Sequence, residues 1–427
     1  MDLHARAERI RELAERMTER MAHHWPEGDL TVNDIEALAE RVAHDVQHEI
    51  SERFLQEEAE RKAGNQLACP CGQRARYQRH HALPLATLSG RVVVRRAYYY
   101  CRRCGKGFCP ADGWLGLGAA NTTPAAQARL AVLAALEPYV QIDDLLAQLG
   151  LPLKVDLKST ERVAQAVGTQ LAQQQLRPFG KAERPLAVGF DGVLYPTWEG
   201  NKEARVGVIY EPEWNAPRTP AAEAGLRKEY FATTGSRESL VALVAARARE
   251  RAGNAVVAVV ADGQALDWVD LDQYLPKRVE ILDFYHVMER VAVIATALHP
   301  EAALAAEWRA ARREELLTQG PRKLLKALRA WQPEPASQEL KRVQLAYFER
   351  QQERMRYPNY LRRGFPIGSG AVEGACKHVV TARFERSGMR WKPATAEPVL
   401  RLRAALLTQP RLDLRAVAAS RHSPIVV

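Results

Sequence analysis

Three acidic residues stand where the chain could hold divalent metal ions. Asp191 follows the apolar run "LAVGF", Asp262 follows "AVVAVVA", and Glu373 follows the glycine-rich stretch "GFPIGSGAV". Magnesium and manganese ions prefer oxygen ligands, and two ions held by shared carboxylates can bind both the attacking and the leaving oxygen of a phosphoryl transfer. These acids therefore predict a site for two Mg²⁺ (or Mn²⁺) ions, with Asp191, Asp262 and Glu373 as metal ligands and catalytic residues.

The sequence around each acid predicts how it is presented. A glycine follows Asp191 and Asp262, so we expect each apolar run to be a strand that ends at its acid, where a sharp turn exposes the carboxylate. An Asp-Gly pair is also a common turn with no further role. Glu373 is expected in the first turn of a helix, where the helix dipole stabilises an acid with or without metal.

Six cysteines occur, and four of them have the arrangement of a structural zinc site. Cys69 and Cys71 precede a hairpin-sized segment that ends at Cys101 and Cys104, and four thiolates from two such pairs form a closed zinc site. A single residue separates Cys69 from Cys71, where two residues are usual in such sites. Cys109 or His80 could therefore replace one of the four ligands. The alternative to a zinc site is a cluster of reduced cysteines. Cys376 is interpreted as a packing residue.

The segment after Glu373 is rich in cations. Cations beside a carboxylate site can hold a phosphate backbone, and an indole can stack on an unpaired base. We therefore predict a DNA-binding segment that comprises Lys377, Arg383, Arg386, Arg390, Trp391 and Lys392.

The central part of the chain has the element order of a ribonuclease-H-like core. Three strand-like runs, "PLAVGFDGVLY", "ARVGVIYE" and "EYFATTG", precede a helix, the strand "AVVAVVA", a second helix and the strand "RVEIL". This β-β-β-α-β-α-β order predicts three antiparallel strands extended by parallel strands. We assign residues 181–286 and 361–410 to this core, and the charged helical segment 287–360 to an insertion within it.

The remaining segments complete an α+β multidomain prediction. Residues 1–62 have apolar positions at helical spacing and predict a helical arm, for dimerisation, for DNA binding or simply packed on the rest. Residues 63–118 predict a zinc-ribbon-like β module. Residues 119–180 predict a helix-turn-helix-like DNA-binding segment, in which Ser159 caps the second helix, or an ordinary helical hairpin. Residues 411–427 are assigned to a tail.

Several motifs together resemble a known enzyme family. In this order, "FDG", "VVADG", "DFYH" and "PIGSGAVEGACKHVVTARFERSGMRW" resemble the DDE transposases of bacterial insertion sequences, in particular the ISKra group, and "RVVVRRAYYYCRRCGKGFCPADGWLGLG" resembles the amino-terminal half of that group. The resemblance covers roughly residues 69–407. It implies that Asp191, Asp262 and Glu373 form the catalytic triad.

A further motif resembles the Asp/Cys-x-x-His element of mutator-like transposases. "DFYH" contains Asp283 and His286. The resemblance implies that His286 lies near the scissile phosphate or a flipped base, whereas the residues alone also allow a structural histidine at a helix start. Asp283 competes with Asp262 for the second metal-ligand position.

Composition is consistent with a folded protein that binds a polyanion. The chain of 427 residues has 61 Lys and Arg against 51 Asp and Glu, a formal net charge of +10, which suits nucleic acid as a partner. It contains no apolar run long enough for a membrane span and no signal-peptide pattern. We therefore expect no membrane association and a cytoplasmic protein that associates with the nucleoid when bound to DNA.

The predicted function is that of a DNA transposase. It would cut the ends of an insertion sequence and join the freed 3′-hydroxyl to double-stranded target DNA, acting as a homodimer or larger assembly because both ends are cut together. Two alternatives remain at this point. One is a ribonuclease-H-like nuclease without strand transfer, and the other is a catalytically silent, zinc-dependent DNA-binding regulator.

Overall fold

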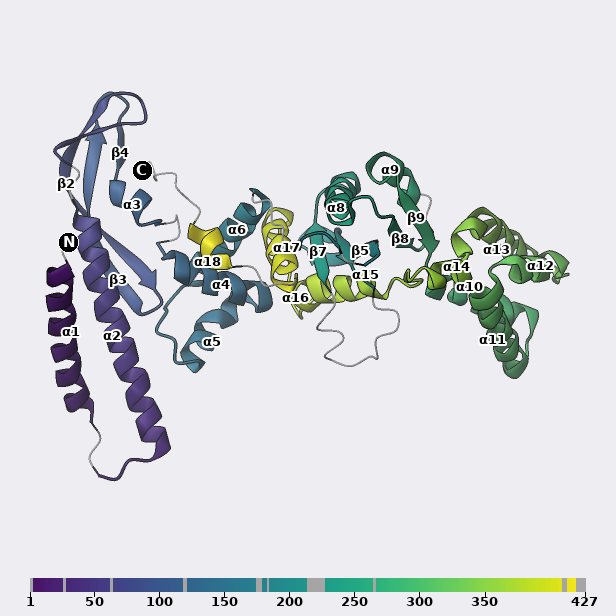
Figure 1. Ribbon diagram of the computed structural model, residues 1–427, viewed down its shortest axis with the longest axis horizontal. Helices are drawn as coiled ribbons and strands as arrows, with labels where there is room; N and C mark the ends of the chain where they lie inside the picture. The colour runs from purple at the N-terminus through teal and green to yellow at the C-terminus, as the bar shows by residue number, and fades with distance from the viewer. Residues whose placement is uncertain are drawn as a thin grey trace. The chain divides into compact units, whose positions relative to one another are not determined.

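The protein is an α+β structure divided into two compact units. The computed structural model describes residues 3–25, 28–61, 64–117, 121–173, 179–182, 184–212, 227–263, 266–408 and 413–419. One unit comprises Met1–Gln170 with Asp413–Val427, and the other comprises Leu171–Leu412. In the described residues, each unit contains a β-sheet with helices packed against part of it (Figure 1).

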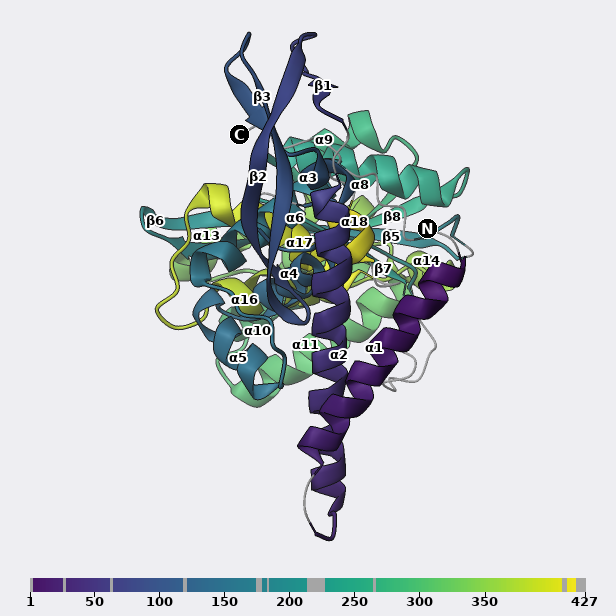
Figure 2. The same cartoon turned by 90° about the vertical axis from the view of Figure 1, so that its left-hand side faces the viewer.

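Two long helices begin the first unit, as the amphipathic pattern predicted. They are α1 (Leu3–His24) and α2 (Val32–Glu60). Thr31 and Asp34 form a capping box that starts α2, and an ion pair between Arg9 and Glu57 joins the two helices. Along α2, Ala59 packs in a hydrophobic cluster against the hairpin of the sheet (Figure 2). The predicted boundary between arm and β module, at residues 62 and 63, lies outside the described residues.

The first sheet is a long hairpin with a short strand on each side. Its four strands, β1 (Gln66–Ala68), β2 (Arg74–Thr87), β3 (Gly90–Cys101) and β4 (Lys106–Phe108), pair antiparallel in sequence order. A bulge between Tyr77 and Arg79 interrupts the hairpin register, which increases its twist. One face of the hairpin packs against α2 near the hairpin turn, and Tyr99 and Ala97 on the opposite face pack around the cysteines.

Short helices follow the sheet. They are α3 (Pro110–Trp114), α4 (Pro124–Leu136), η1 (Tyr139–Gln141), α5 (Ile142–Gln148) and α6 (Leu157–Gln173). The prediction that Ser159 caps the second helix is wrong: the Asp156 carboxylate accepts the backbone N–H of Ser159, 2.6 Å away, and an Asp side chain is as good a cap. The connection, residues 149–156, is also longer than the three- to four-residue turn of a compact helix-turn-helix.

The segment predicted as a tail contains a helix. Within its described part, α18 (Leu414–Ala419) buries Leu414, Val417 and Ala418 and contacts α4. The rest of the predicted tail, residues 411, 412 and 420–427, lies outside the described residues.

The second unit is built on a mixed five-stranded sheet. Its strands β5 (Leu186–Thr197), β6 (Gly200–Tyr210), β7 (Lys228–Thr233), β8 (Val257–Ala261) and β9 (Arg278–Leu282) lie in the order β7-β6-β5-β8-β9. The first three are antiparallel, and β8 and β9 are parallel to β5. The element order β-β-β-α-β-α-β, with α8 (Arg237–Ala252) and α9 (Leu266–Tyr274) as connections, is the one predicted.

Successive side chains of β5 point to opposite faces of this sheet. Leu186 and Val188 point into a hydrophobic cluster with α8 and α9. Gly189 and Asp191 therefore face the other side, where α15 (Gly370–Ala375) lies (Figure 1). The site is thus placed on the face of the sheet that α8 does not cover.

The rest of the described part of this unit is mainly helical. Residues 287–360 contain helices in their described structure, as predicted; the helices from Phe284 onward are α10 (Phe284–Leu298), α11 (Ala302–Gln319), α12 (Arg322–Ala330), η2 (Pro335–Ser337), α13 (Gln338–Gln351), η3 (Gln352–Met355) and α14 (Tyr357–Arg362). After α15 the chain continues through a π-helical turn, η4 (Cys376–Thr381), into α16 (Ala382–Phe384) and then α17 (Pro393–Leu407), which packs on β7.

None of the helices in the described residues combines the length and the apolar character that a membrane crossing needs.

Candidate functional sites

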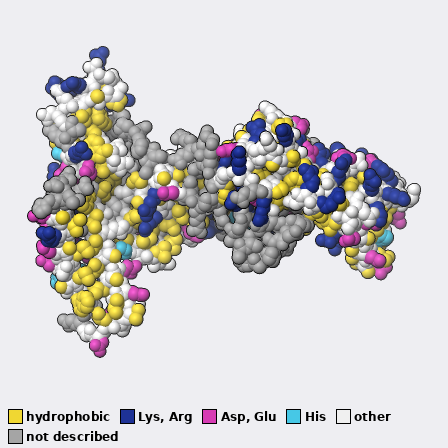
Figure 3. Space-filling view, viewed as in Figure 1, with side chains coloured by type: hydrophobic (Ala, Val, Ile, Leu, Met, Phe, Trp, Pro, Cys, Tyr) yellow, Lys and Arg dark blue, Asp and Glu magenta, His cyan; other side chains and the backbone are white. Residues whose placement is uncertain are grey.

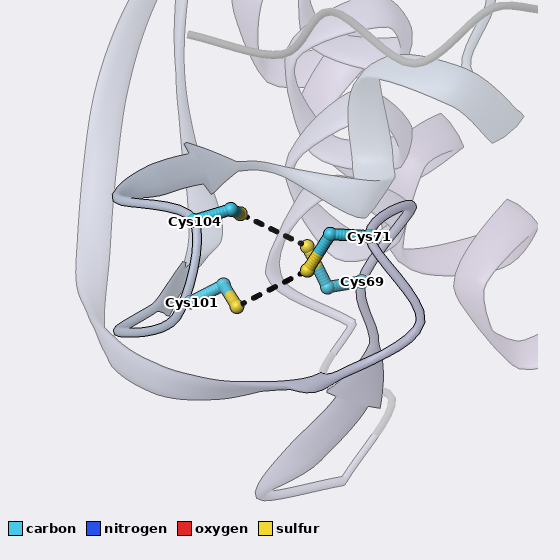
Figure 4. Close-up of side chains that lie close together, drawn as sticks. All are labelled: Cys69, Cys71, Cys101 and Cys104. Atoms are coloured by element: carbon cyan, nitrogen blue, oxygen red, sulfur yellow. Dashed lines mark hydrogen bonds between the residues drawn. The ribbon is translucent and has the colours of Figure 1, made fainter.

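The four predicted cysteines converge into one cluster. The sulfur of Cys69 lies 3.6 Å from that of Cys104, and the sulfur of Cys71 lies 3.7 Å from that of Cys101 (Figure 4). All four sulfurs lie within 4.8 Å of one another. Four Zn–S bonds of about 2.3 Å in a tetrahedron would place the sulfurs about 3.8 Å apart. The cluster therefore has the donor set and the size of a structural zinc site.

Two tight turns bring these cysteines together. The N–H of Gly72 donates to the carbonyl of Cys69 at 2.9 Å, and the N–H of Gly105 donates to the carbonyl of Cys101 at the same distance. Both glycines have positive φ, 82° and 70°, which other residues adopt only with strain. Backbone N–H groups of Cys104 and Arg103 lower the pKa of Cys101 to about 7, whereas burial and the neighbouring thiols raise the pKa of Cys69 to about 12. Metal binding would therefore release a proton from Cys69.

The alternative ligands lie outside this cluster. Cys109 is buried near Arg96 and Asp112, where burial raises its pKa to about 11, and His80 accepts or donates a hydrogen bond with the Tyr77 hydroxyl at 3.0 Å. The Cys69-Pro70-Cys71 spacing is therefore compatible with convergence of the sulfurs.

Asp191 does not end its strand, so that part of the sequence prediction is wrong. β5 continues to Thr197, and Asp191 pairs with Val206 in the middle of its ladder with β6. What ends here is the pairing with β8, whose last pair is Gly189 with Val260. The alternating pattern after Gly192 continues to favour a strand. Asp191 therefore lies just beyond the end of the parallel pairing, on the part of β5 that extends past β8.

The glutamate helix approaches β5 closely because Gly189 has no side chain. A Cβ atom at Gly189 would lie 3.0 Å from the Cβ of Val372, on α15. A glycine inside a strand often marks such a close approach. Glu373 lies next to Val372, in the first turn of α15 as predicted, and is exposed.

Cys376, predicted to be a packing residue, is buried and also contacts Asp191. Its sulfur lies 3.7 Å from Asp191 Oδ2, while the N–H of Gly192 donates to Oδ1 at 2.7 Å. Burial of the Asp191 carboxylate raises its pKa; these two donors oppose the change, and the charges of Asp262 and Glu373 add to it. Burial, with the charges of Asp191 and Glu373, raises the pKa of Cys376 to about 12, so the thiol stays protonated as a donor.

The turn at Asp262 is held by the helical insertion. Asp262 follows the last residue of β8, as predicted. The Tyr347 hydroxyl of α13 donates to the Asp262 carbonyl at 2.9 Å, and the Gln351 amide donates to the Gly263 carbonyl at 2.8 Å. Gly263 has φ of 90°, and a Cβ there would clash with Leu282 at 2.5 Å. The insertion is therefore a structural part of this turn.

Asp283 is fully buried and connects His286 to the glutamate helix. Its Oδ2 accepts from Nδ1 of His286 at 2.6 Å and lies 2.6 Å from the Ser369 hydroxyl. The Ser369 hydroxyl is also 2.5 Å from Glu373 Oε1, so one serine bridges the two carboxylates. Ser369 was missed in the sequence, although its position four residues before Glu373 on a helix start was a usable signal.

His286 has one ring nitrogen committed to Asp283 and 42% of its side chain exposed. Burial by itself lowers the pKa of His286, but the hydrogen bond and charge of Asp283, with the charges of Glu289 and Asp262, raise it above its ordinary value. This arrangement can present a protonated imidazole toward an anion. Because Asp283 is buried and already accepts several hydrogen bonds, it is a poorer candidate metal ligand than Asp262.

The three predicted acids influence one another without forming a compact metal-binding cluster. The charges of Asp262 and Glu373 both act on Asp191. Three or more His, Cys, Asp or Glu side chains whose ligand atoms lie close together could hold a metal ion. Among the described residues, the four cysteines meet this condition and the three acids do not. An all-carboxylate set suits Mg²⁺ chemically, and binding of both ions would require the carboxylates to draw closer.

The basic segment after Glu373 is only partly available to a ligand. Lys377, Arg390 and Lys392 are exposed and Arg386 is half-buried. The predictions for Arg383 and Trp391 are wrong, because these residues are 1% and 5% exposed. Trp391 stacks on Phe384 with 4.2 Å between ring centroids, and the Arg383 guanidinium lies over the indole. The backbone N–H of Trp391 donates to the Pro196 carbonyl at 3.0 Å, which ties this segment to the end of β5.

A comparison of the chain with models of known protein families and with curated proteins finds no match in either.

The cysteine cluster generates a test by metal content. We expect about one zinc ion per chain, as in other four-cysteine sites, and loss of this zinc in Cys101→Ser, since three thiolates leave the tetrahedron open. Cys109→Ser is the control, because Cys109 is buried outside the cluster. Elemental analysis of the purified proteins measures both, and unchanged zinc in Cys101→Ser would contradict the assignment.

The close approach of Gly189 and Val372 can be tested by measuring the free energy of unfolding. Gly189→Ala places a methyl group against Val372, and overpacking of this kind costs about 1–3 kcal/mol. Gly374→Ala is the control on α15, because a Cβ there meets nothing within 4 Å. Urea denaturation should show a lower free energy of unfolding for Gly189→Ala alone; equal values for the two variants would show that α15 does not need this close approach.

Proposed function

We propose that this protein is a DNA transposase with a ribonuclease-H-like catalytic core, similar to the DDE transposases of bacterial insertion sequences. It would cleave the ends of an insertion sequence in a metal-dependent reaction and transfer the 3′-hydroxyl to target DNA. The observation that carries the proposal is the convergence of three chain segments on one side of the mixed sheet: Asp191 on β5, Asp262 after β8, and Glu373 on the helix that packs against Gly189.

The order of strands supports the core assignment. Three antiparallel strands followed by two parallel ones, with β5 at the centre and β8 beside it, place the carboxyl end of β8 next to the middle of β5. Asp262 and Asp191 are therefore brought to the same region of the sheet by backbone pairing, and α15 reaches this region from a segment more than 100 residues later in the chain.

The three carboxylates would hold two Mg²⁺ (or Mn²⁺) ions. When bound, such ions polarise the phosphate and lower the pKa of an attacking water or hydroxyl. The chain supplies the anionic ligands, and Ser369 orients Glu373 through its contact with Asp283. His286, oriented by Asp283 and partly exposed, would donate a hydrogen bond to a phosphate oxygen.

The exposed cations after Glu373 would bind the DNA backbone near this site. Lys377, Arg390 and Lys392 project to the surface, whereas Arg403 is buried and donates to the carbonyls of His378 and Val379. Double-stranded DNA, both as insertion-sequence end and as target, is the proposed partner. A homodimer or larger assembly is proposed because two ends must be processed together.

The carboxylates generate the central test. Asp191→Asn, Asp262→Asn and Glu373→Gln should each abolish Mg²⁺-dependent cleavage of the element's ends, a loss of at least about 10³-fold, and leave DNA affinity within a few-fold of the parent protein. Labelled DNA carrying the flanking sequence of the gene serves as substrate. Retained cleavage in Asp262→Asn would transfer the metal-ligand role to Asp283.

The same assay separates the alternatives. Transfer of a labelled 3′ end into plasmid DNA supports a transposase, whereas nicking without joining identifies a nuclease. DNA binding that Glu373→Gln does not alter, together with an absence of cleavage in every form, identifies a silent regulator.

The contact of the insertion with the Asp262 turn generates a second test. Tyr347→Phe removes the hydroxyl that donates to the Asp262 carbonyl, a loss of about 1 kcal/mol, and should raise the Mg²⁺ concentration needed for half-maximal cleavage several-fold. Tyr360→Phe is the control, since its hydroxyl donates to the carbonyls of Glu353 and Glu280 instead. The same metal requirement in both variants would exclude a positioning role for Tyr347.

A further inference from the structure

One face of the β2–β3 hairpin, at its cysteine end, is formed by basic and aromatic side chains. Cross-strand pairs place Arg76 opposite Tyr100, Arg79 opposite Tyr98 and His81 opposite Arg96. Residues directly opposite in a ladder share a face, so these side chains lie together. The basic face is defined here as Arg74, Arg76, Arg79, His81, Arg96, Tyr98 and Tyr100.

This face points away from the hydrophobic core of its module. Tyr99, Ala97 and Cys101 alternate with the basic-face residues of β3 and are buried with the other cysteines. Arg74, Arg76 and Arg79 are exposed, while Tyr98 and Tyr100 are half-buried. Tyr98 stacks on His81 with 4.1 Å between ring centroids and an interplanar angle of 11°, so the aromatic rings form the floor from which the arginines project.

The charge of this region is strongly one-sided. Residues 64–117 contain nine Arg and Lys and a single acidic residue, Asp112, and Asp112 is bound to Arg96. Arg102, Arg103 and Lys106 add exposed cations in the turn beside the cysteines. On the visible surface, Lys and Arg gather at this end of the hairpin (Figure 3).

Within the described residues, no ion pair joins Arg74, Arg76 or Arg79 to a carboxylate, and the Nε–H of Arg79 donates to Nε2 of His81 at 3.0 Å. Like charges held close together repel one another, and this repulsion is relieved when an anion binds. Burial and the charges of Arg79 and Arg96 lower the pKa of His81, which is consistent with a positive potential over this face.

We propose that the basic face of the hairpin binds the phosphate backbone of duplex DNA. The guanidinium groups match phosphate oxygens in geometry and charge, and the cysteine cluster fixes the strands that carry them. The proposal rests on the proposed function for the identity of the polyanion. It assigns the cysteine module a direct part in DNA binding, separate from the segment after Glu373.

The test is DNA affinity as a function of salt, measured by fluorescence anisotropy with the full-length protein and a fluorescein-labelled duplex of random sequence. Arg74→Gln/Arg76→Gln should weaken binding at least several-fold. Each lost phosphate contact should reduce the slope of log affinity against log salt by about 0.9, so the double variant should lose about 2 from the slope.

The control is Arg309→Gln/Arg313→Gln, which removes the same charge from exposed positions on α11. Affinity and slope should stay close to those of the parent protein. Equal effects of the two double variants, or no effect of Arg74→Gln/Arg76→Gln, would overturn the proposal, as would binding to heparin without binding to duplex DNA.

Two further measurements keep the outcome decisive. If the zinc content of Arg74→Gln/Arg76→Gln falls, the variant Arg74→Lys/Arg76→Lys is tested in its place. DNA binding by the lysine variant close to that of the parent protein supports a charge contact. DNA binding as weak as that of the glutamine variant overturns the proposal. If the protein binds DNA through this face in a salt-dependent way but cleaves no DNA, the proposed catalytic function is wrong and the proposed surface stands. If the protein cleaves DNA but the Arg74 and Arg76 changes leave its DNA affinity unaltered, the proposed surface is wrong and the proposed catalytic function stands.

Discussion

The contact between Gly189 and Val372 is the constraint on which the candidate site depends. The strand and the helix approach closely only because one position on β5 lacks a side chain. The consequence is that Glu373 and Cys376 lie over the same face of the sheet as Asp191. The π-helical turn that follows α15 keeps this helix in contact with β5 and β6, and turns of this kind often occur at functional sites.

Buried hydrogen bonds connect the other residues of the candidate site to the helix that packs on Gly189. Asp283, which has no exposure to solvent, joins the start of α10, Ser369 and the partly exposed His286 in one network. A buried carboxylate is costly unless its oxygens are satisfied, and here hydrogen-bond donors reach both oxygens. The network therefore specifies the relative positions of the histidine and the glutamate helix more narrowly than apolar packing would.

Prediction from the sequence succeeded where local pattern determines structure. Strand and helix order follows from hydrophobic periodicity, and the four cysteines follow from their pairing across a hairpin. The prediction failed where long-range packing decides. The indole of Trp391 lies in a basic segment of the sequence, yet stacking on Phe384 buries it. The strand-like run through Asp191 does not show where its pairing with the parallel strand β8 ends. The bridge formed by Ser369 depends on Asp283, which lies 86 residues earlier.

The helical insertion has a consequence for how the protein is made. Tyr347 and Gln351 secure the turn after β8, and Glu373 follows them in the chain, so synthesis on the ribosome completes the sheet and the insertion before the last carboxylate emerges. During that interval the face of β5 that carries Gly189 has no helix over it. A nascent chain therefore passes through a stage at which its core strands are present and the site is incomplete, and a product truncated before Glu373 would remain at that stage.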